Sequence, residues 1–129
     1  MSYSASRDNL ELNLEQNAMD SLVHGVEHFV NEEKPSDLKY TILHTFHAVE
    51  LFLKARLAKV NPRLIITKND HTIYYGTLIE RLKKEGVSLS EQDQRDLDAL
   101  REMRNSIEHH QINESRSNIE HYLGRAMYF

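Results

Sequence analysis

Apolar residues recur at steps of three and four along most of this chain, which is the spacing of helices that bury one face. The pattern predicts five helices, over residues 10–30, 36–60, 77–85, 90–113 and 115–129. The second of these is apolar over more than half of its circumference, so we expect it to lie at the centre and to contact neighbours on several sides. In the first, the residues expected to face the core are Leu12, Met19, Leu22, Val23, Val26 and Phe29.

Residues with known capping preferences stand at the predicted helix ends. Ser36 and Asp37 have side chains that cap the amino end of a helix, and Pro62 stops the helix that they begin. Gly86 stands where a helix can end in the left-handed conformation, and Ser90, followed three residues later by an aspartate, opens the next helix. Most of the predicted boundaries therefore have a local cause.

Residues 63–75 lack a helical period, so we expect a loop there, with Leu64, Ile65 and Ile66 packed against the core. The chain has 4 glycines, 2 prolines and few alternating runs, which argues against a sheet. Its 129 residues are the length of one domain. We therefore expect a single all-α domain over residues 1–129, an antiparallel bundle of about five helices. Because the last helix is still running at Phe129, we also expect the natural chain to continue beyond it.

The composition narrows the possible chemistry. There is no cysteine, which excludes disulfides, thiolate zinc sites and cysteine nucleophiles, and no stretch approaches the roughly 20 apolar residues of a membrane helix. We therefore expect a cytoplasmic protein that does not bind a membrane. The net charge of −4 argues against a protein that coats nucleic acid without sequence specificity, because such proteins are basic. Two short basic runs, residues 54–68 and 81–84, can line a local groove or simply keep the surface solvated.

The carboxyl-terminal part of the fourth predicted helix holds the most chemical information. Arg104 lies beside the apolar face of this helix, and a guanidinium near an apolar surface needs an anionic partner, a subunit boundary or a ligand. One alternative is an internal salt bridge to Glu50 or Glu108. Asn105 and His109, four residues apart, share a helix face that Arg104 flanks.

A strip with a cation, an amide and an imidazole suits phosphodiester chemistry when two copies meet across a two-fold axis. The paired strips would bring two histidines and two arginines to one cleft. One imidazole can take the proton of a ribose 2′-hydroxyl, and its twin can protonate the leaving 5′-oxygen. The arginines can stabilise the negative charge of the transition state. This mechanism needs no metal.

The spacing from Arg104 to His109 resembles the R-x4-6-H motif of HEPN domains, in which Asn, Asp or His commonly follows the arginine. Residues 46–55, FHAVELFLKA, resemble the apolar second helix of these domains, and residues 97–105, LDALREMRN, resemble the approach to the motif. The resemblance covers most of the chain from about Ser36 onward. It implies an HEPN-like bundle that forms a homodimer through the motif-bearing helices.

For catalytic members, the resemblance implies a metal-independent endoribonuclease that leaves 2′,3′-cyclic phosphate ends and serves as a toxin or defence component. RNA is then the substrate, no cofactor is needed, and the motif residues are the catalytic ones. The alternative within the same family is a non-catalytic module for dimerisation, interaction or nucleotide binding. The catalytic residues would be Arg104, Asn105 and His109, and further substrate contacts would come from Lys54, Arg101 and His110.

Toxins of this family that are paired with a nucleotidyltransferase antitoxin often continue the motif as H-x-Y. This chain has His109, His110 and Gln111 and lacks that tyrosine. An antitoxin of this kind is the partner that the resemblance implies, but the sequence departs from the pattern on which its regulation depends.

His44, His47 and Glu50, at steps of three, resemble the beginning of a metal site. Carboxylate-bridged dimetal bundles need Glu-x-x-His pairs on separate helices, and the sequence has no second matching pair. We therefore expect no metal site. His47 and Glu50 are better interpreted as core-facing polar groups, one of which orients Arg104.

Two further pairs have a structural and a functional interpretation. His24 and His28, four residues apart, are interpreted as surface residues rather than as ligands of a bound group. His110 can assist His109 or simply be its exposed neighbour, and we favour the second interpretation. Tyr74 and Tyr75 can stack on a base or anchor a loop on the core. No Gly-rich phosphate loop, G-x-S-x-G or H-E-x-x-H occurs, which leaves nucleotide hydrolysis, esterase and zinc-protease functions without support.

Overall fold

The computed structural model describes residues 3–69, 71–109 and 115–127, with side chains from Asn13 onward except those of residues 108 and 109. In this part of the chain the fold is a bundle of five α-helices with no strand beyond one isolated bridge, so the predicted all-α class is confirmed. The elements are α1 (Tyr3–Val30), α2 (Pro35–Val60), the short 3-10 helix η1 (Pro62–Ile65), α3 (Tyr75–Lys84), α4 (Glu91–His109) and α5 (Arg116–Ala126).

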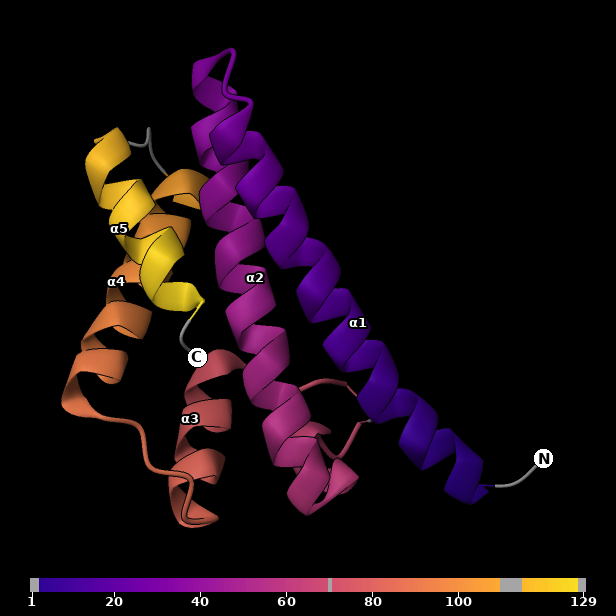
Figure 1. Ribbon diagram of the computed structural model, residues 1–129. Coiled ribbons are helices and arrows are strands. Elements are labelled where there is room, and N and C mark those ends of the chain that lie inside the picture. Colours follow the sequence, from indigo (N-terminus) through magenta and orange to yellow (C-terminus); the bar gives the residue numbers. More distant parts are fainter. Residues whose placement is uncertain (1–2, 70, 110–114, 128–129) are drawn as a thin grey trace.

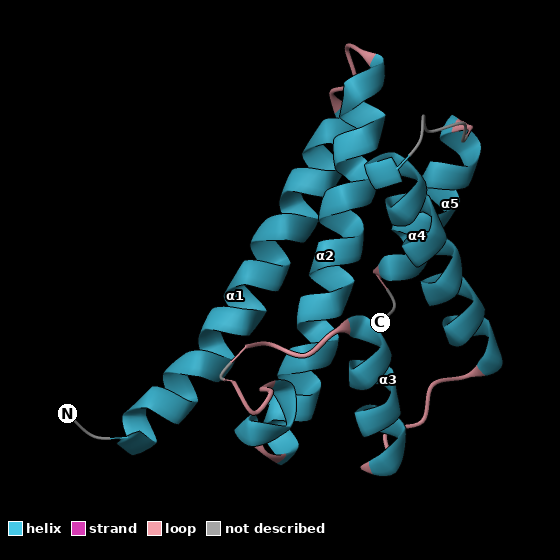
Figure 2. Cartoon of the chain, turned by 180° about the vertical axis from the view of Figure 1, so that it is seen from behind, coloured by secondary structure: helices cyan, strands magenta, loops and turns pink. Residues whose placement is uncertain are grey.

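Helix α2 lies at the centre of the bundle. Helices α1 and α2 form a long antiparallel pair, and α3, α4 and α5 pack on the side of α2 away from α1 (Figure 1). The pair lies closest at the turn that joins the two helices and diverges toward the start of α1 (Figures 1 and 2). Helix α2 contacts each of the other four helices, as its apolar pattern predicted.

Small residues form the contact of α1 with α2. Ala18, Ser21 and Gly25 are buried on the side of α1 that faces α2. A Cβ atom at Gly25 would lie 3.1 Å from Oγ1 of Thr45 and 3.4 Å from the carbonyl oxygen of Thr41, which is tighter than ordinary contact. The absence of a side chain at Gly25 therefore lets the two helices approach closely.

The predicted buried face of α1 is wrong in part. Phe29 is buried, and Leu22 and Val26 are partly buried, as expected. Met19 and Val23 are instead 52% and 45% exposed. The contact with α2 is narrow and uses the small residues on the adjacent stripe, so the larger apolar side chains beside it point outward.

The amino end of α2 is capped differently from the prediction. The helix begins at Pro35 with Lys34 as the N-cap residue, so Asp37 stands in the first turn. Its carboxylate accepts hydrogen bonds from the backbone N–H groups of Glu33 at 2.9 Å and of Lys34 at 3.1 Å. Proline suits this first position because a backbone N–H there would have no hydrogen-bond partner within the helix, so its absence costs nothing.

Other helix ends follow their local sequence signals. Gly86 has a φ of 80°, the left-handed conformation predicted for it. The Ser90 hydroxyl accepts a hydrogen bond from the N–H of Asp93 at 3.0 Å, and Ser115 accepts one from the N–H of Asn118 at 3.2 Å. The predicted end of the fourth helix at residues 112–113 lies outside the described residues. Helix α5 ends at Ala126, earlier than predicted.

The core consists of two apolar clusters around α2. The larger joins α2 to α3, α4 and the segment before α3, where Ile65 is buried and Leu64 and Ile66 pack against the cluster, as expected. The smaller joins the paired ends of α1 and α2 to α4 and α5. Together they hold α4 against α2, which positions the motif residues. The buried members of the smaller cluster are Phe29, Ile42, Met103, Ile119 and Leu123.

Among the described residues, no helix combines the length and the apolar character that a membrane crossing requires.

Candidate functional site

Arg104 and Asn105 are joined directly on α4. The Nε–H of Arg104 donates a hydrogen bond to Oδ1 of Asn105 at 3.2 Å, and both side chains are partly buried. A hydrogen bond to Nε occupies one edge of the guanidinium and limits its rotation. The structure therefore brings two of the three predicted catalytic residues together as one polar unit.

The guanidinium of Arg104 rests on an aromatic ring of α2. Its central carbon lies 4.6 Å from the centre of the Phe46 ring, and Phe46 is buried. A cation over the face of an aromatic ring is attracted by the negative charge density of that face. This contact explains how an arginine beside the apolar face of α4 is accommodated, which the sequence left open.

A second arginine repeats this arrangement about one helical turn earlier. The guanidinium of Arg101 lies 5.0 Å from the centre of the Tyr75 ring, and the Tyr75 and Phe46 rings are themselves 5.5 Å apart. Two guanidinium groups on α4 thus stand over two neighbouring aromatic rings from α2 and α3. Arg101 is exposed, and it was among the residues predicted to contact substrate.

Tyr75 belongs to the support of this site. Burial raises its pKa to about 12, the carboxylates of Asp98 and Glu50 add to the increase, and Arg101 opposes it. The phenol is therefore neutral at physiological pH. Its hydroxyl is buried without a hydrogen-bond partner among the described residues. Two acids thus lie near the two arginines, and the site carries mixed charge.

His109 is the last residue of α4. Its backbone lies one helical turn beyond Asn105, as the spacing of four requires. Its side chain lies outside the part that the structure describes, and so does all of His110. The predicted salt-bridge alternative through Glu108 falls outside it for the same reason.

Lys54 is placed away from the two arginines. It lies on α2 two helical turns after Phe46, its side chain is buried, and its Nζ donates to Oγ1 of Thr72 at 3.3 Å. The structure therefore brings Arg101, but not the amine of Lys54, to Arg104 and Asn105.

The expectation that His47 faces the core is wrong, because His47 is exposed on α2. Glu50 is partly buried and lies near Tyr75, as its influence on that phenol indicates. A residue next to Phe46 in sequence points about 100° away from it on a helix, which turns His47 out of the interface.

Three histidines that the sequence did not connect meet between α1 and α2. The His44 ring stacks on His28 with centres 5.7 Å apart and lies 5.6 Å from His24. His28 also contacts the Asp37 carboxylate, with Nδ1 3.0 Å from Oδ1. Burial lowers the pKa of His44, and the charges of His28, His24 and His47 lower it further. Antiparallel pairing of the two helices is the signal that would have connected them.

The adjacent residues Tyr74 and Tyr75 lie in different environments. Tyr75 is buried against Phe46, the anchoring role that was one of two interpretations, whereas Tyr74 is 83% exposed. In the described part of the chain, no three His, Asp or Glu side chains are arranged to hold a metal ion.

Two hollows lie elsewhere on the bundle. One, of about 580 Å³, lies over α2 between α1 and the segment that precedes α4. The other, of about 250 Å³, lies between α4 and α5, beside Met103 and Tyr122. Neither is lined by Arg104 or Asn105.

Neither a protein-family model, nor a curated protein, nor a solved structure matches this chain.

Proposed function

We propose that this protein is a metal-independent endoribonuclease of the HEPN type that acts as a homodimer through α4. The observation that carries the proposal is the guanidinium of Arg104, which Phe46 supports at 4.6 Å and Asn105 holds at 3.2 Å, with Asn105 one helical turn before His109. A toxin or a defence component is the role that we infer for such an enzyme, with a nucleotidyltransferase antitoxin as one partner to test.

The support of Arg104 favours phosphate binding. A guanidinium whose central carbon lies over a ring still has N–H groups at its edges, which can donate to phosphate oxygens. Arg101, held on Tyr75 in the same way, adds a second cation along the same helix. Donors that are already oriented need little rearrangement when charge develops in a transition state.

The reaction that we propose is transfer of the phosphodiester to the neighbouring ribose oxygen. His109 of one protomer takes the proton of the 2′-hydroxyl, the 2′-oxygen forms a bond to phosphorus, and the bond to the 5′-oxygen breaks. The other protomer's His109 gives its proton to that leaving oxygen. The products are a 2′,3′-cyclic phosphate and a 5′-hydroxyl. Arg104 and Asn105 bind the phosphate oxygens as their negative charge grows.

The homodimer completes the site in this proposal. In one protomer, Arg104 and Asn105 form a partly buried polar strip on α4. Pairing of two such strips across a two-fold axis would create the cleft and supply both the acid and the base. A cleft of this kind would bring the mixed charges of Arg101 and Asp98 to its rim.

The test is incubation of the purified protein with cellular RNA in the presence of EDTA. Arg104→Ala and His109→Ala should lower the cleavage rate by about 10²- to 10⁴-fold, the scale on which an acid, a base or a charge-stabilising group contributes. The matched controls are Arg95→Ala, an exposed arginine on α4, and His121→Ala, an exposed histidine on α5, which should both retain the wild-type rate. Equal rates in all five proteins would contradict the catalytic assignment. A folded wild-type dimer that cleaves no RNA would favour the non-catalytic module instead.

A further inference from the structure

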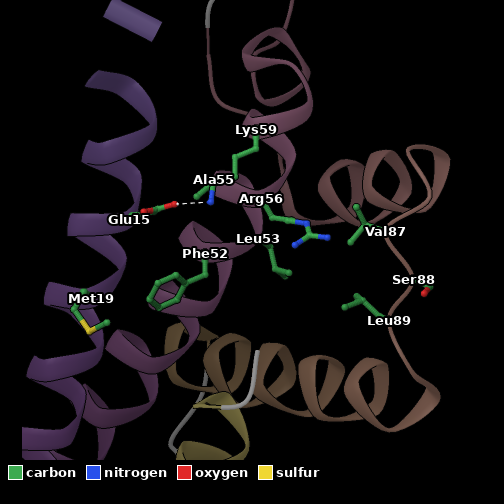
Figure 3. Close-up of a pocket in the computed structure, with 10 residues that line it drawn as sticks. All are labelled: Glu15, Met19, Phe52, Leu53, Ala55, Arg56, Lys59, Val87, Ser88 and Leu89. Carbon is green, nitrogen blue, oxygen red and sulfur yellow. Dashed lines mark ion pairs between the residues drawn. The ribbon is translucent and has the colours of Figure 1, made fainter. Parts of the chain in front are cut away.

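The hollow of about 580 Å³ lies on the face of the bundle where α1 and α2 diverge. The second half of α2 forms its floor. Helix α1 forms one side, and the segment between α3 and α4 forms the other (Figure 3). The lining residues are Glu15, Met19, Phe52, Leu53, Ala55, Arg56, Lys59, Val87, Ser88 and Leu89. A volume between about 300 and 1,000 Å³ is typical of sites for small molecules.

The lining is apolar on both sides of α2. Figure 3 shows Leu53, Val87 and Leu89 directed into the space between α2 and the segment before α4, and Phe52 near Met19 on the α1 side. Val87 and Leu89 pack against the larger core cluster, so the wall that they form is attached to the bundle. An apolar molecule in the hollow would therefore contact fixed surfaces and displace water from them.

The hollow contains one uncommitted cation. Lys59 pairs through Nζ with Oε1 of Glu15 at 3.3 Å. Arg56 is exposed, and its guanidinium has neither an ion pair nor a hydrogen bond with another residue in the described part of the chain. Its guanidinium extends from α2 toward Val87 (Figure 3). An anionic group in the hollow would thus meet one available guanidinium beside an apolar surface.

We propose that this hollow binds an amphipathic carboxylate, with the acyl or similar apolar chain on Phe52, Leu53 and Leu89 and the carboxylate on Arg56. A carboxylate fits better than a phosphate because only one cation is uncommitted and because Glu15, at the same hollow, repels a second negative charge. A guanidinium and a carboxylate can form two parallel hydrogen bonds. The size of the hollow suits a single small molecule rather than a partner helix, which needs a groove long enough for several turns.

Titration of the full chain with decanoate, followed by calorimetry and by NMR, tests the proposal. Saturable binding of one decanoate per protein is expected, and decanol, which has no charge, should bind at least about tenfold more weakly. Arg56→Gln should weaken decanoate binding by about ten- to a hundredfold. The matched control is Arg63→Gln, an exposed arginine just after α2 and outside the lining, which should bind as the wild type does.

A second variant keeps the test independent of Arg56. Ser88→Glu adds a negative charge to the exposed rim and should also weaken decanoate binding. Absence of saturable binding, or equal binding by wild type and Arg56→Gln, would overturn the proposal. Tighter binding of decyl phosphate than of decanoate would overturn the choice of a carboxylate. Self-association that Ser88→Glu abolishes, with no response to decanoate, would assign the hollow to a second copy of the chain and overturn it as well.

Discussion

The guanidinium of Arg104 lies over the ring of Phe46, with 4.6 Å between its central carbon and the ring centre. This contact joins α4 to the central helix α2 at the residue on which the proposed chemistry depends. The ring contacts the guanidinium on one side, and the hydrogen bond from its Nε–H to Asn105 limits its rotation. The orientation of Arg104 therefore depends on shape and on a planar delocalised cation, not on charge alone.

Replacement of Arg104 by lysine tests this dependence. Lysine keeps the positive charge but has no planar group to lie on Phe46 and no Nε–H for Asn105. If the proposed function is right, Arg104→Lys should lower kcat/KM for RNA by roughly 10²-fold, close to the effect of Arg104→Ala. The control is Arg95→Lys on the exposed side of α4. Retention of most of the activity in Arg104→Lys would mean that charge alone suffices.

The two buried threonines of α2 make a matched pair for stability. Thr41 donates its hydroxyl to the carbonyl oxygen of Asp37 at 2.9 Å, whereas the Thr45 hydroxyl is buried without a partner among the described residues. Valine has nearly the same shape and no hydroxyl. Thr45→Val should therefore raise the free energy of unfolding by about 0.5–1 kcal/mol, and Thr41→Val should lower it by a similar amount. Urea denaturation measures both, and equal changes in the two variants would contradict this account.

The contact of α5 with α4 includes a buried carboxylate. The Asp96 side chain is 3% exposed and accepts hydrogen bonds from Nε of Arg125 at 2.6 Å and from Nε2 of Gln92 at 3.0 Å. Arg125→Leu would leave this carboxylate buried with one neutral partner, which should lower the free energy of unfolding by about 2–3 kcal/mol.

Arg116 supplies the comparison for that variant. Its ion pair with Glu32 has an N–O distance of 2.8 Å, but the two side chains are 52% and 29% exposed. Arg116→Leu should lower the free energy of unfolding by less than about 1 kcal/mol, because water stabilises the carboxylate of Glu32 that remains. Equal losses in Arg125→Leu and Arg116→Leu, measured by urea denaturation, would show that the burial of Asp96 has no consequence.

The histidine cluster predicts a dependence of stability on pH. Burial and the neighbouring histidines hold the pKa of His44 below its ordinary value of 6.5 in the folded state. As the pH falls from neutrality through 6.5, the unfolded chain therefore binds more protons than the folded chain, and the free energy of unfolding decreases. The groups that face His44 are His24 and His28 on α1 and His47 on α2, with Asp20 acting in the opposite direction.

Chemical denaturation between about pH 7.5 and about pH 5.5 measures this effect. His44→Gln should show a smaller loss of stability over that range than the wild type. The control is His71→Gln, an exposed histidine in the segment before α3, which should follow the wild-type curve. An unchanged slope in His44→Gln would exclude His44 as a source of the dependence.

Features that depend on neighbours in sequence were predictable. The central position of α2 followed from its apolar circumference, and the caps at Gly86, Ser90 and Ser115 followed from single residues. The buried stripe of α1 did not follow, because Ala18, Ser21 and Gly25 are small and carry little hydrophobic signal. Their importance depends on the shape of α2, where Thr45 meets Gly25.

In the candidate site, too, contacts within one helix were predictable from the sequence, whereas contacts between helices were not. Arg104 and Asn105 are adjacent on one helix, so their association was predictable from spacing. The aromatic rings of Phe46 and Tyr75 come from two other helices and meet the arginines only through packing. The same holds for His44, which joins the α1 histidines because the helices run antiparallel.

The chemical identity of the RNA ends after cleavage in EDTA tests the central claim most directly. Attack by the 2′-hydroxyl, with His109 as acid and base, predicts 2′,3′-cyclic phosphate and 5′-hydroxyl ends, and no cleavage where the attacking hydroxyl is replaced by hydrogen. Ends with a 3′-hydroxyl and a 5′-phosphate, or cleavage that persists without the 2′-hydroxyl, would contradict the account.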